Sequence, residues 1–210
     1  MTKTIIRKWW VGPVAALAAA VAALGWFVIP ASGADTEDAV SAACGHHYEP
    51  NSISVDGDVN QPVSLTVGQL QALPGQQTLN ISYLNHLGAL QHFSETGPTL
   101  WNVLAIAAGG LKIPPLTHNQ YPGPNPQTVL YIVVIGTDGY QTLIAEGDID
   151  PGFSNAPVLV AYAENGTPLS QVPYNATENK GPAQLVVPND THGGRYANQI
   201  CRITVVDGAL

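Results

Sequence analysis

Glycine and proline recur at short intervals along this chain, and their spacing restricts it to short elements of secondary structure. The 210 residues include 21 Gly and 17 Pro, spread without a repeating triplet. Such residues end helices and form turns, so short strands separated by turns are expected and an all-helical fold is disfavoured. Hydrophobic residues make up 45% of the sequence and charged residues 10%, which suffices for a buried core. The sequence therefore predicts an α+β, mainly β domain.

Short apolar or alternating segments between the turns are the predicted strands. They cover residues 52–55, 62–65, 78–84, 128–135, 140–145, 157–163, 185–187 and 200–206. The first two form a ribbon with one buried face. Asp138-Gly139 predicts a hairpin between 128–135 and 140–145, and we expect this hairpin to be central to the sheet.

Two short helices are predicted between the strands. Thr66 can cap the first, over 67–73, and Pro98 suits the first turn of the second, which ends at Gly109-Gly110. The segment 85–97 has no sustained period and is interpreted as a loop or an irregular ribbon.

Residues 1–34 have the features of an export signal or an N-terminal membrane anchor. Three basic residues come first, namely Lys3, Arg7 and Lys8. The nearly uncharged run over 9–29 is longer than a usual signal core and could span a bilayer, so cleavage and retention both stay open. Basic residues stay on the cytoplasmic side, which predicts an extracytoplasmic location for the rest. An N-terminal arm over 35–50 then leads to a body over 51–210.

The charge balance limits the partners. The formal net charge is −8, and without the first three basic residues 4 basic residues face 15 acidic ones, a net charge of −11. Nucleic-acid binding needs clustered Lys and Arg, and the remaining four are scattered: Lys112, Lys180, Arg195 and Arg202. We therefore expect no nucleic-acid partner and membrane contact only through the N-terminal segment. A small-molecule ligand or a cell-surface protein partner remains open.

Two cysteines are present, Cys44 before the body and Cys201 in its last predicted strand. In an exported chain such a pair predicts a disulfide that joins the N-terminal arm to the end of the core. The alternative, a catalytic or metal-ligating thiol, has no CxxC or CxxCH motif to support it.

Metal sites and common catalytic motifs have little support in the sequence. The histidines to test first are His46, His47, His86 and His92, but the His86 to His92 spacing places the two on one face of neither a helix nor a strand. Solvated or locally hydrogen-bonded histidines are the alternative. We predict no metal site, and no GxSxG, HExxH or P-loop motif is present.

Several short phrases follow one another along the body in an informative order. They are ISVDGDV with PVSLTV (53–67), GPTLWNVL (97–104), TDGY (137–140), VLVAYAENGTPL (158–169) and GPAQLVVP (181–188). This order resembles the oxidoreductase molybdopterin-binding domain family, which includes sulfite oxidases and small bacterial relatives. The resemblance implies a mixed-sheet, sulfite oxidase-type fold over 51–210, a molybdopterin cofactor and redox activity.

The resemblance also implies where a cofactor would bind. In that family a cysteine in the loop after the third strand ligates molybdenum, and the corresponding stretch here, 83–88, contains none. Gln184 stands where the family commonly has Arg, and a basic residue expected near Asn198 is missing. The candidate cofactor-binding residues are His86, Asp138, Tyr140, Gln184 and Arg195, and no catalytic residue is identified.

Two functions follow. The first is an exported binding or assembly module that has lost the molybdenum site; the alternative is an active molybdopterin-dependent oxidoreductase with an atypical metal site, in which solvent or His86 replaces the thiolate. For the binding module the expected pocket lies beneath 85–97, walled by 138–140 and the segment around Arg195. The rings that either line this pocket or fill it are His92, Phe93, Tyr140 and Tyr196.

Overall fold

A computed structural model describes residues 43–45, 49–112 and 130–208, and the structural statements below concern these residues. Residues 1–34, His46 and His47 lie outside them, so what the sequence predicts for these stays a prediction. The described residues belong to one compact unit. None of the described helices is long and apolar enough to cross a membrane.

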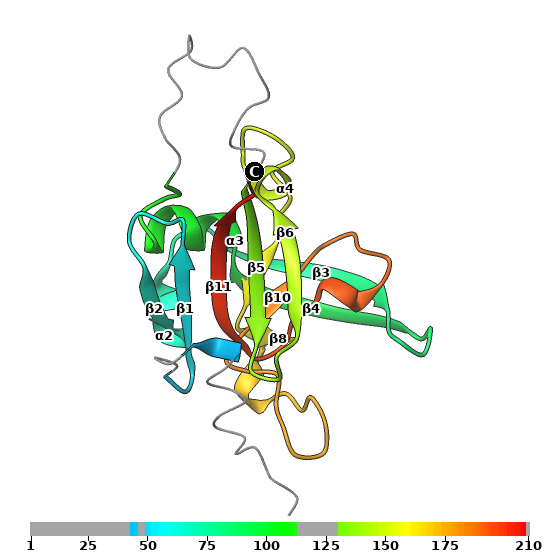
Figure 1. Ribbon diagram of the computed structural model, residues 1–210. Coiled ribbons are helices and arrows are strands. Elements are labelled where there is room, and N and C mark those ends of the chain that lie inside the picture. The colour runs from blue at the N-terminus through cyan, green and yellow to red at the C-terminus, as the bar shows by residue number, and fades with distance from the viewer. Residues whose placement is uncertain (1–42, 46–48, 113–129, 209–210) are drawn as a thin grey trace, which may run out of the picture. The chain divides into compact units, whose positions relative to one another are not determined.

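A five-stranded mixed sheet forms one layer of the core (Figure 1). In spatial order its strands are β2 (Val63–Thr66), β1 (Ser52–Gly57), β11 (Ile200–Asp207), β5 (Leu130–Gly136) and β6 (Gln141–Ala145). Strands β1 and β11 are parallel, and the other neighbours are antiparallel. The predicted ribbon and hairpin are both present. The hairpin is not central as expected, because the C-terminal β11 inserts between it and β1 and leaves β6 at the edge.

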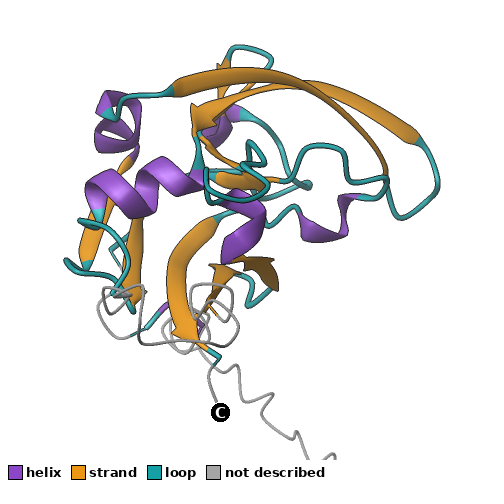
Figure 2. Ribbon diagram, turned by 90° about the horizontal axis from the view of Figure 1, so that it is seen from above, coloured by secondary structure: helices purple, strands orange, loops and turns teal. Residues whose placement is uncertain are grey.

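A second, antiparallel sheet contains a long ribbon. Its strands are β3 (Gln76–Leu84), β4 (Leu90–Pro98), β8 (Ala163–Glu164) and β9 (Thr167–Pro168). The turn between β3 and β4 projects away from the five-stranded sheet in Figure 1, and Figure 2 shows the ribbon as a long arc. Of the two interpretations of 85–97, the loop is wrong from Leu90 onward, and the ribbon agrees with the pairing of β3 with β4. Its alternation is masked because Glu95, a charged residue, occupies a buried position of the strand.

The predicted strand over 157–163 is divided between two sheets. Its first part, β7 (Leu159–Ala161), pairs with β10 (Gln184–Val186), and its second part, β8, joins β4. At Gly97 the backbone of β7 approaches closely, since a Cβ there would lie 2.3 Å from the carbonyl oxygen of Val160. Only glycine allows β4 and β7 to pack at this distance.

Short helices connect the sheets. Helix α2 (Val67–Ala72) begins at Thr66 with a capping box completed by Gln69, as the Thr66 cap predicted. Thr99 caps α3 (Leu100–Asn102), which continues as the π-helical turn η1 (Val103–Ala107). The sequence predicted these two helices and missed α4 (Glu146–Ile149), which is only four residues long.

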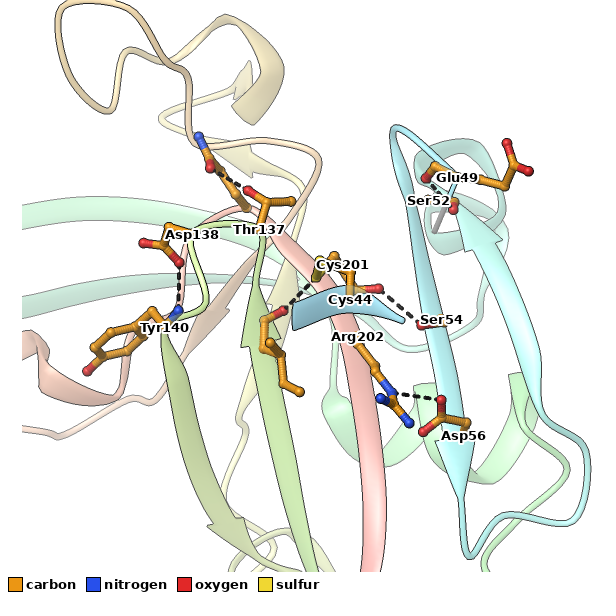
Figure 3. Close-up of a disulfide and its surroundings, with 12 residues drawn as sticks. Cys44, Glu49, Ser52, Ser54, Asp56, Thr137, Asp138, Tyr140, Cys201 and Arg202 are labelled. Carbon is orange, nitrogen blue, oxygen red and sulfur yellow. Dashed lines mark hydrogen bonds and ion pairs between the residues drawn. A yellow bond between two sulfur atoms is a disulfide. The ribbon is translucent and has the colours of Figure 1, made fainter. Parts of the chain in front are cut away.

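The predicted disulfide between Cys44 and Cys201 is confirmed, with their Cα atoms 5.5 Å apart. Both cysteines are buried and pack against Ile135 of β5. Figure 3 shows the bridge beside the start of β11, with Ser54 of β1 donating a hydrogen bond to the Cys201 carbonyl. The N-terminal arm is thereby fastened to the central strand of the sheet.

Candidate functional site

Three aromatic rings pack together where β3 ends. The Tyr83 ring centroid lies 4.6 Å from that of Tyr196 and 6.0 Å from that of Phe93. The Tyr196 hydroxyl donates to the Val187 carbonyl at 3.0 Å. Gly193 lies so close that a Cβ on it would be 2.6 Å from the Tyr83 ring. These contacts leave no free volume between the Tyr83 ring and Gly193.

Behind these rings lies a buried acidic pair with one lysine. Glu95 of β4 is directly opposite Glu164 of β8, and both are buried. Lys180 donates to Glu164 and also lies 4.6 Å above the Phe93 ring. Neither Glu95 oxygen receives a hydrogen bond from any described neighbour.

Burial and the Glu164 charge raise the pKa of Glu95 to about 8. At neutral pH Glu95 is therefore mostly protonated. Desolvation, followed by the charges of Glu164 and Glu95, also raises the pKa of Tyr83. The group thus carries Lys180 and one ionised carboxylate, which balance each other.

Arg195 is held by two aspartates. The Nε and Nη2 of Arg195 donate hydrogen bonds to the Asp190 carboxylate at 2.8 Å and 2.5 Å. The Asp148 carboxylate lies 3.9 Å from Nη1 of Arg195. The hydrogen bonds to Asp190 are the main cause of the raised pKa of Arg195. Two carboxylates outnumber the one guanidinium, so this group has net negative charge.

Two cavities flank the 3₁₀ turn η4 (Gly193–Arg195). The larger, about 380 Å³, lies at the end of β3 and is lined by Tyr83, Leu84, Asn85, His86, His192, Gly193 and Gly194. The smaller, about 220 Å³, is lined by Asp138, Tyr140, Tyr174, Gly193, Tyr196 and Asn198. Gly193 belongs to both, so the cavities are neighbours.

The candidate residues from the sequence are distributed unevenly over this region. His86 lines the larger cavity, whereas Asp138 and Tyr140 line the smaller one. Arg195 follows Gly194 in η4, and Gln184 is buried in β10 opposite Ala161, with no donor to its Oε1.

The four rings that the sequence analysis expects around one pocket do not lie together in the structure. Tyr140 and Tyr196 line the smaller cavity, whereas Phe93 packs against Tyr83. His92 is exposed, and its Nδ1 is hydrogen-bonded to the Ser82 hydroxyl at 2.7 Å.

Several residues of this region were missed from the sequence. They are Tyr83, Glu95, Glu164, Tyr174, Lys180 and His192. Glu164 stands between the predicted strand 157–163 and Asn165-Gly166, where an acidic turn residue is common, and a single lysine makes no motif. A usable signal was Glu95 itself, one charged residue among the uncharged neighbours of 90–98.

The fold is that of sulfite oxidase-type proteins, as the order of sequence phrases implied. A solved structure with this likeness is the sulfane dehydrogenase SoxCD from Paracoccus pantotrophus. It is 20% identical, with a TM-score of 0.55, and the match covers 76% of this chain and 39% of that chain. The present chain thus corresponds to well under half of that protein. No family model and no curated protein matches the sequence.

A phosphate-bearing molybdopterin does not fit the residues found here. The stretch that the resemblance assigns to the metal ligand, 83–88, contains no cysteine, and its first residue, Tyr83, packs against Tyr196 and Gly193. Arg195 is already held by Asp190, and Lys180 by Glu164. Anionic cofactors need unpaired cations or convergent N–H groups, and no described lysine or arginine lines either cavity beside η4.

Proposed function

We propose that this chain is an extracytoplasmic binding module on a sulfite oxidase-type fold, without a molybdenum centre. Its ligand is a small molecule that binds at the two cavities beside η4. One observation carries the proposal: the stretch 83–88, where the resemblance puts the metal ligand, has no cysteine, and no described lysine or arginine lines the cavity beside it. This larger cavity has polar groups from Asn85, His86 and His192 at its wall.

Two features support an extracytoplasmic location. The buried Cys44–Cys201 disulfide suits an oxidising compartment, and residues 1–34 have the pattern of an export segment. An alkaline phosphatase fusion at the C-terminus of the full chain tests this. The fusion is expected to be active, and a matched fusion that lacks 1–34 is expected to be inactive. An inactive full-length fusion would contradict export.

An active molybdopterin oxidoreductase with an atypical metal site is the alternative. The likeness of fold favours it, and His86 is the side chain in the corresponding loop that could serve as ligand. Under this alternative the ion pairs of Arg195 and Lys180 would have to open to admit the cofactor.

The two functions differ in what stabilises the folded chain. We would express the full chain in matched hosts, one able and one unable to make molybdenum cofactor, and compare thermal unfolding. A bound cofactor stabilises the native state by mass action, so the proposal predicts the same Tm from both hosts. A Tm several degrees higher from the cofactor-making host would contradict it.

His86→Ala is the matched variant for this comparison. The proposal predicts that the substitution shifts Tm equally in both hosts, because no metal depends on the imidazole. A loss confined to the cofactor-making host would instead identify His86 as a ligand and favour the oxidoreductase.

A further inference from the structure

We propose that the smaller cavity binds a small organic cation, such as a quaternary ammonium group, within a cage formed by Tyr140, Tyr174, Tyr196 and Asp138. This inference rests on the proposed binding function and specifies the ligand class. It follows from three properties of the cavity: its rings, its charge and its size.

The rings come from three separate parts of the chain. Tyr140 follows the β5–β6 turn, Tyr174 lies in the loop after η3 (Leu169–Gln171), and Tyr196 follows η4. Two of the hydroxyls are already engaged, since Tyr140 donates to the Gly194 carbonyl and Tyr196 to the Val187 carbonyl. Those hydroxyl protons are therefore not available to a ligand, and the aromatic rings are what these side chains can present.

Aromatic rings attract cations through their negative faces. Tyr140 and Tyr174 are 44% and 45% exposed, so both rings remain reachable by a ligand from solution. Tyr196, packed on Tyr83, forms one wall of the cavity, and Tyr140 and Tyr174 supply the two accessible rings that an alkylated ammonium group would contact.

The charges around the cavity favour the same ligand. Asp138 lines it, with Oδ1 fixed by the Tyr140 N–H at 2.9 Å (Figure 3). No described Lys or Arg lines it. Arg195, close by in η4, is outnumbered by Asp148 and Asp190, and the chain has a net charge of −8. An anion would meet repulsion here, whereas a cation is attracted.

The volume of about 220 Å³ limits the ligand to a small group. Drug-sized ligands occupy pockets of about 300–1,000 Å³, so a headgroup fits and a large cofactor does not. Free ammonium compounds and phosphocholine lipid headgroups share this chemistry, and the experiment separates them.

Choline is the probe, and its carbon isostere 3,3-dimethylbutanol is the uncharged control. Line broadening of the N-methyl NMR signal, titrated against the full chain in mild detergent, gives the affinity. Choline is expected to bind at least about tenfold more tightly than the isostere, because only the cation interacts with the rings and with Asp138. Equal affinity for the two would overturn the proposal.

Two pairs of variants locate the site. Asp138→Asn is expected to weaken choline binding about tenfold, whereas Asp58→Asn, which removes the same charge elsewhere on the surface, leaves it unchanged within about twofold. Tyr140→Leu weakens binding more than Tyr140→Phe, because only the first removes the ring. Identical effects of Asp138→Asn and Asp58→Asn would overturn the cage.

A sedimentation assay with phosphatidylcholine vesicles distinguishes the sources of the cation. Binding of free choline assigns a soluble ammonium compound, vesicle binding that Asp138→Asn weakens assigns a lipid headgroup, and either result supports the cage. Vesicle binding that Asp138→Asn leaves unchanged comes from the N-terminal segment and, without choline binding, overturns the cage. Binding to neither overturns it. If the protein binds neither probe, yet is folded and has the same Tm from both hosts, the proposed ligand class is wrong and the proposed binding function is not contradicted.

Discussion

Glu95 and Glu164 face each other across two strands, and Lys180 neutralises only one of them. Burying a second carboxylate would be costly unless it keeps its proton, and that is the state at neutral pH indicated by the raised pKa of Glu95. No pattern in the sequence announces this arrangement. The strand pairing that brings residues 95 and 164 together is a tertiary event, and Lys180 comes from a third segment.

The protonated Glu95 predicts that stability falls as pH rises. Its folded-state pKa of about 8 exceeds the ordinary value of 4.5, so its contribution is complete below about pH 4.5 and is lost as pH rises through about 8. Relative to Glu95→Gln, the wild-type free energy of unfolding is expected to drop over this range by a few kcal/mol.

Urea unfolding of both proteins from pH 5 to 9 measures the drop. Glu146, whose pKa burial and Asp150 raise to about 7, acts in the same direction but is present in both proteins. Parallel curves for the two proteins would show that Glu95 is ionised throughout.

Gly193 and Gly194 make a matched pair for the packing around Tyr83. A Cβ at Gly193 would lie 2.6 Å from the Tyr83 ring, whereas a Cβ at Gly194 meets no atom within 4 Å. Gly193→Ala is expected to destabilise the fold by about 1–3 kcal/mol through overpacking, and Gly194→Ala by well under 1 kcal/mol. Chemical denaturation measures both, and similar losses would mean that Tyr83 is not packed against residue 193.

At the scale of elements, short sequence patterns predicted the turns and helix starts. They did not predict features that depend on the pairing of strands distant in sequence. Asp138-Gly139 and the Thr66 cap specify a hairpin and a helix start within a few residues, and both are present. The position of β11 at the centre of the sheet depends on its pairing with β1, 148 residues earlier, and with β5, at least 64 residues earlier, which no short pattern contains. Strand β4 was missed because its buried side includes Glu95.

The disulfide joins the N-terminal arm to β11, two segments that are far apart in the sequence. Cys44 and Cys201 are 157 residues apart, and a closed loop of this length stabilises a fold by about 4–5 kcal/mol in the chain-entropy model. Reduction is therefore expected to cost about 2–5 kcal/mol. Thermal unfolding with and without reductant measures the loss, and the double variant Cys44→Ser, Cys201→Ser should not respond to reductant. An unchanged wild-type Tm would contradict a structural role for the bridge.

At the scale of the whole molecule, the order of phrases along residues 53–188 predicted a sulfite oxidase-type fold. The missing cysteine in 83–88 already argued against a metal ligand. What the sequence could not predict is the pairing of Arg195 with Asp190 and the packing of Tyr83 on Tyr196, since both depend on how loops meet. The fold was thus predictable in outline, and the chemistry of the site only through what it lacks.

The most direct test of the account is the molybdenum and pterin content of the full chain, purified from a host that makes the cofactor. Both are measured per mole of folded protein beside a molybdopterin enzyme produced in the same host. The account predicts metal and pterin at the level of a buffer blank, because 83–88 supplies no thiolate and the nearby Arg195 and Lys180 are held in ion pairs. Near-equimolar molybdenum with pterin would contradict it and make the oxidoreductase the primary function.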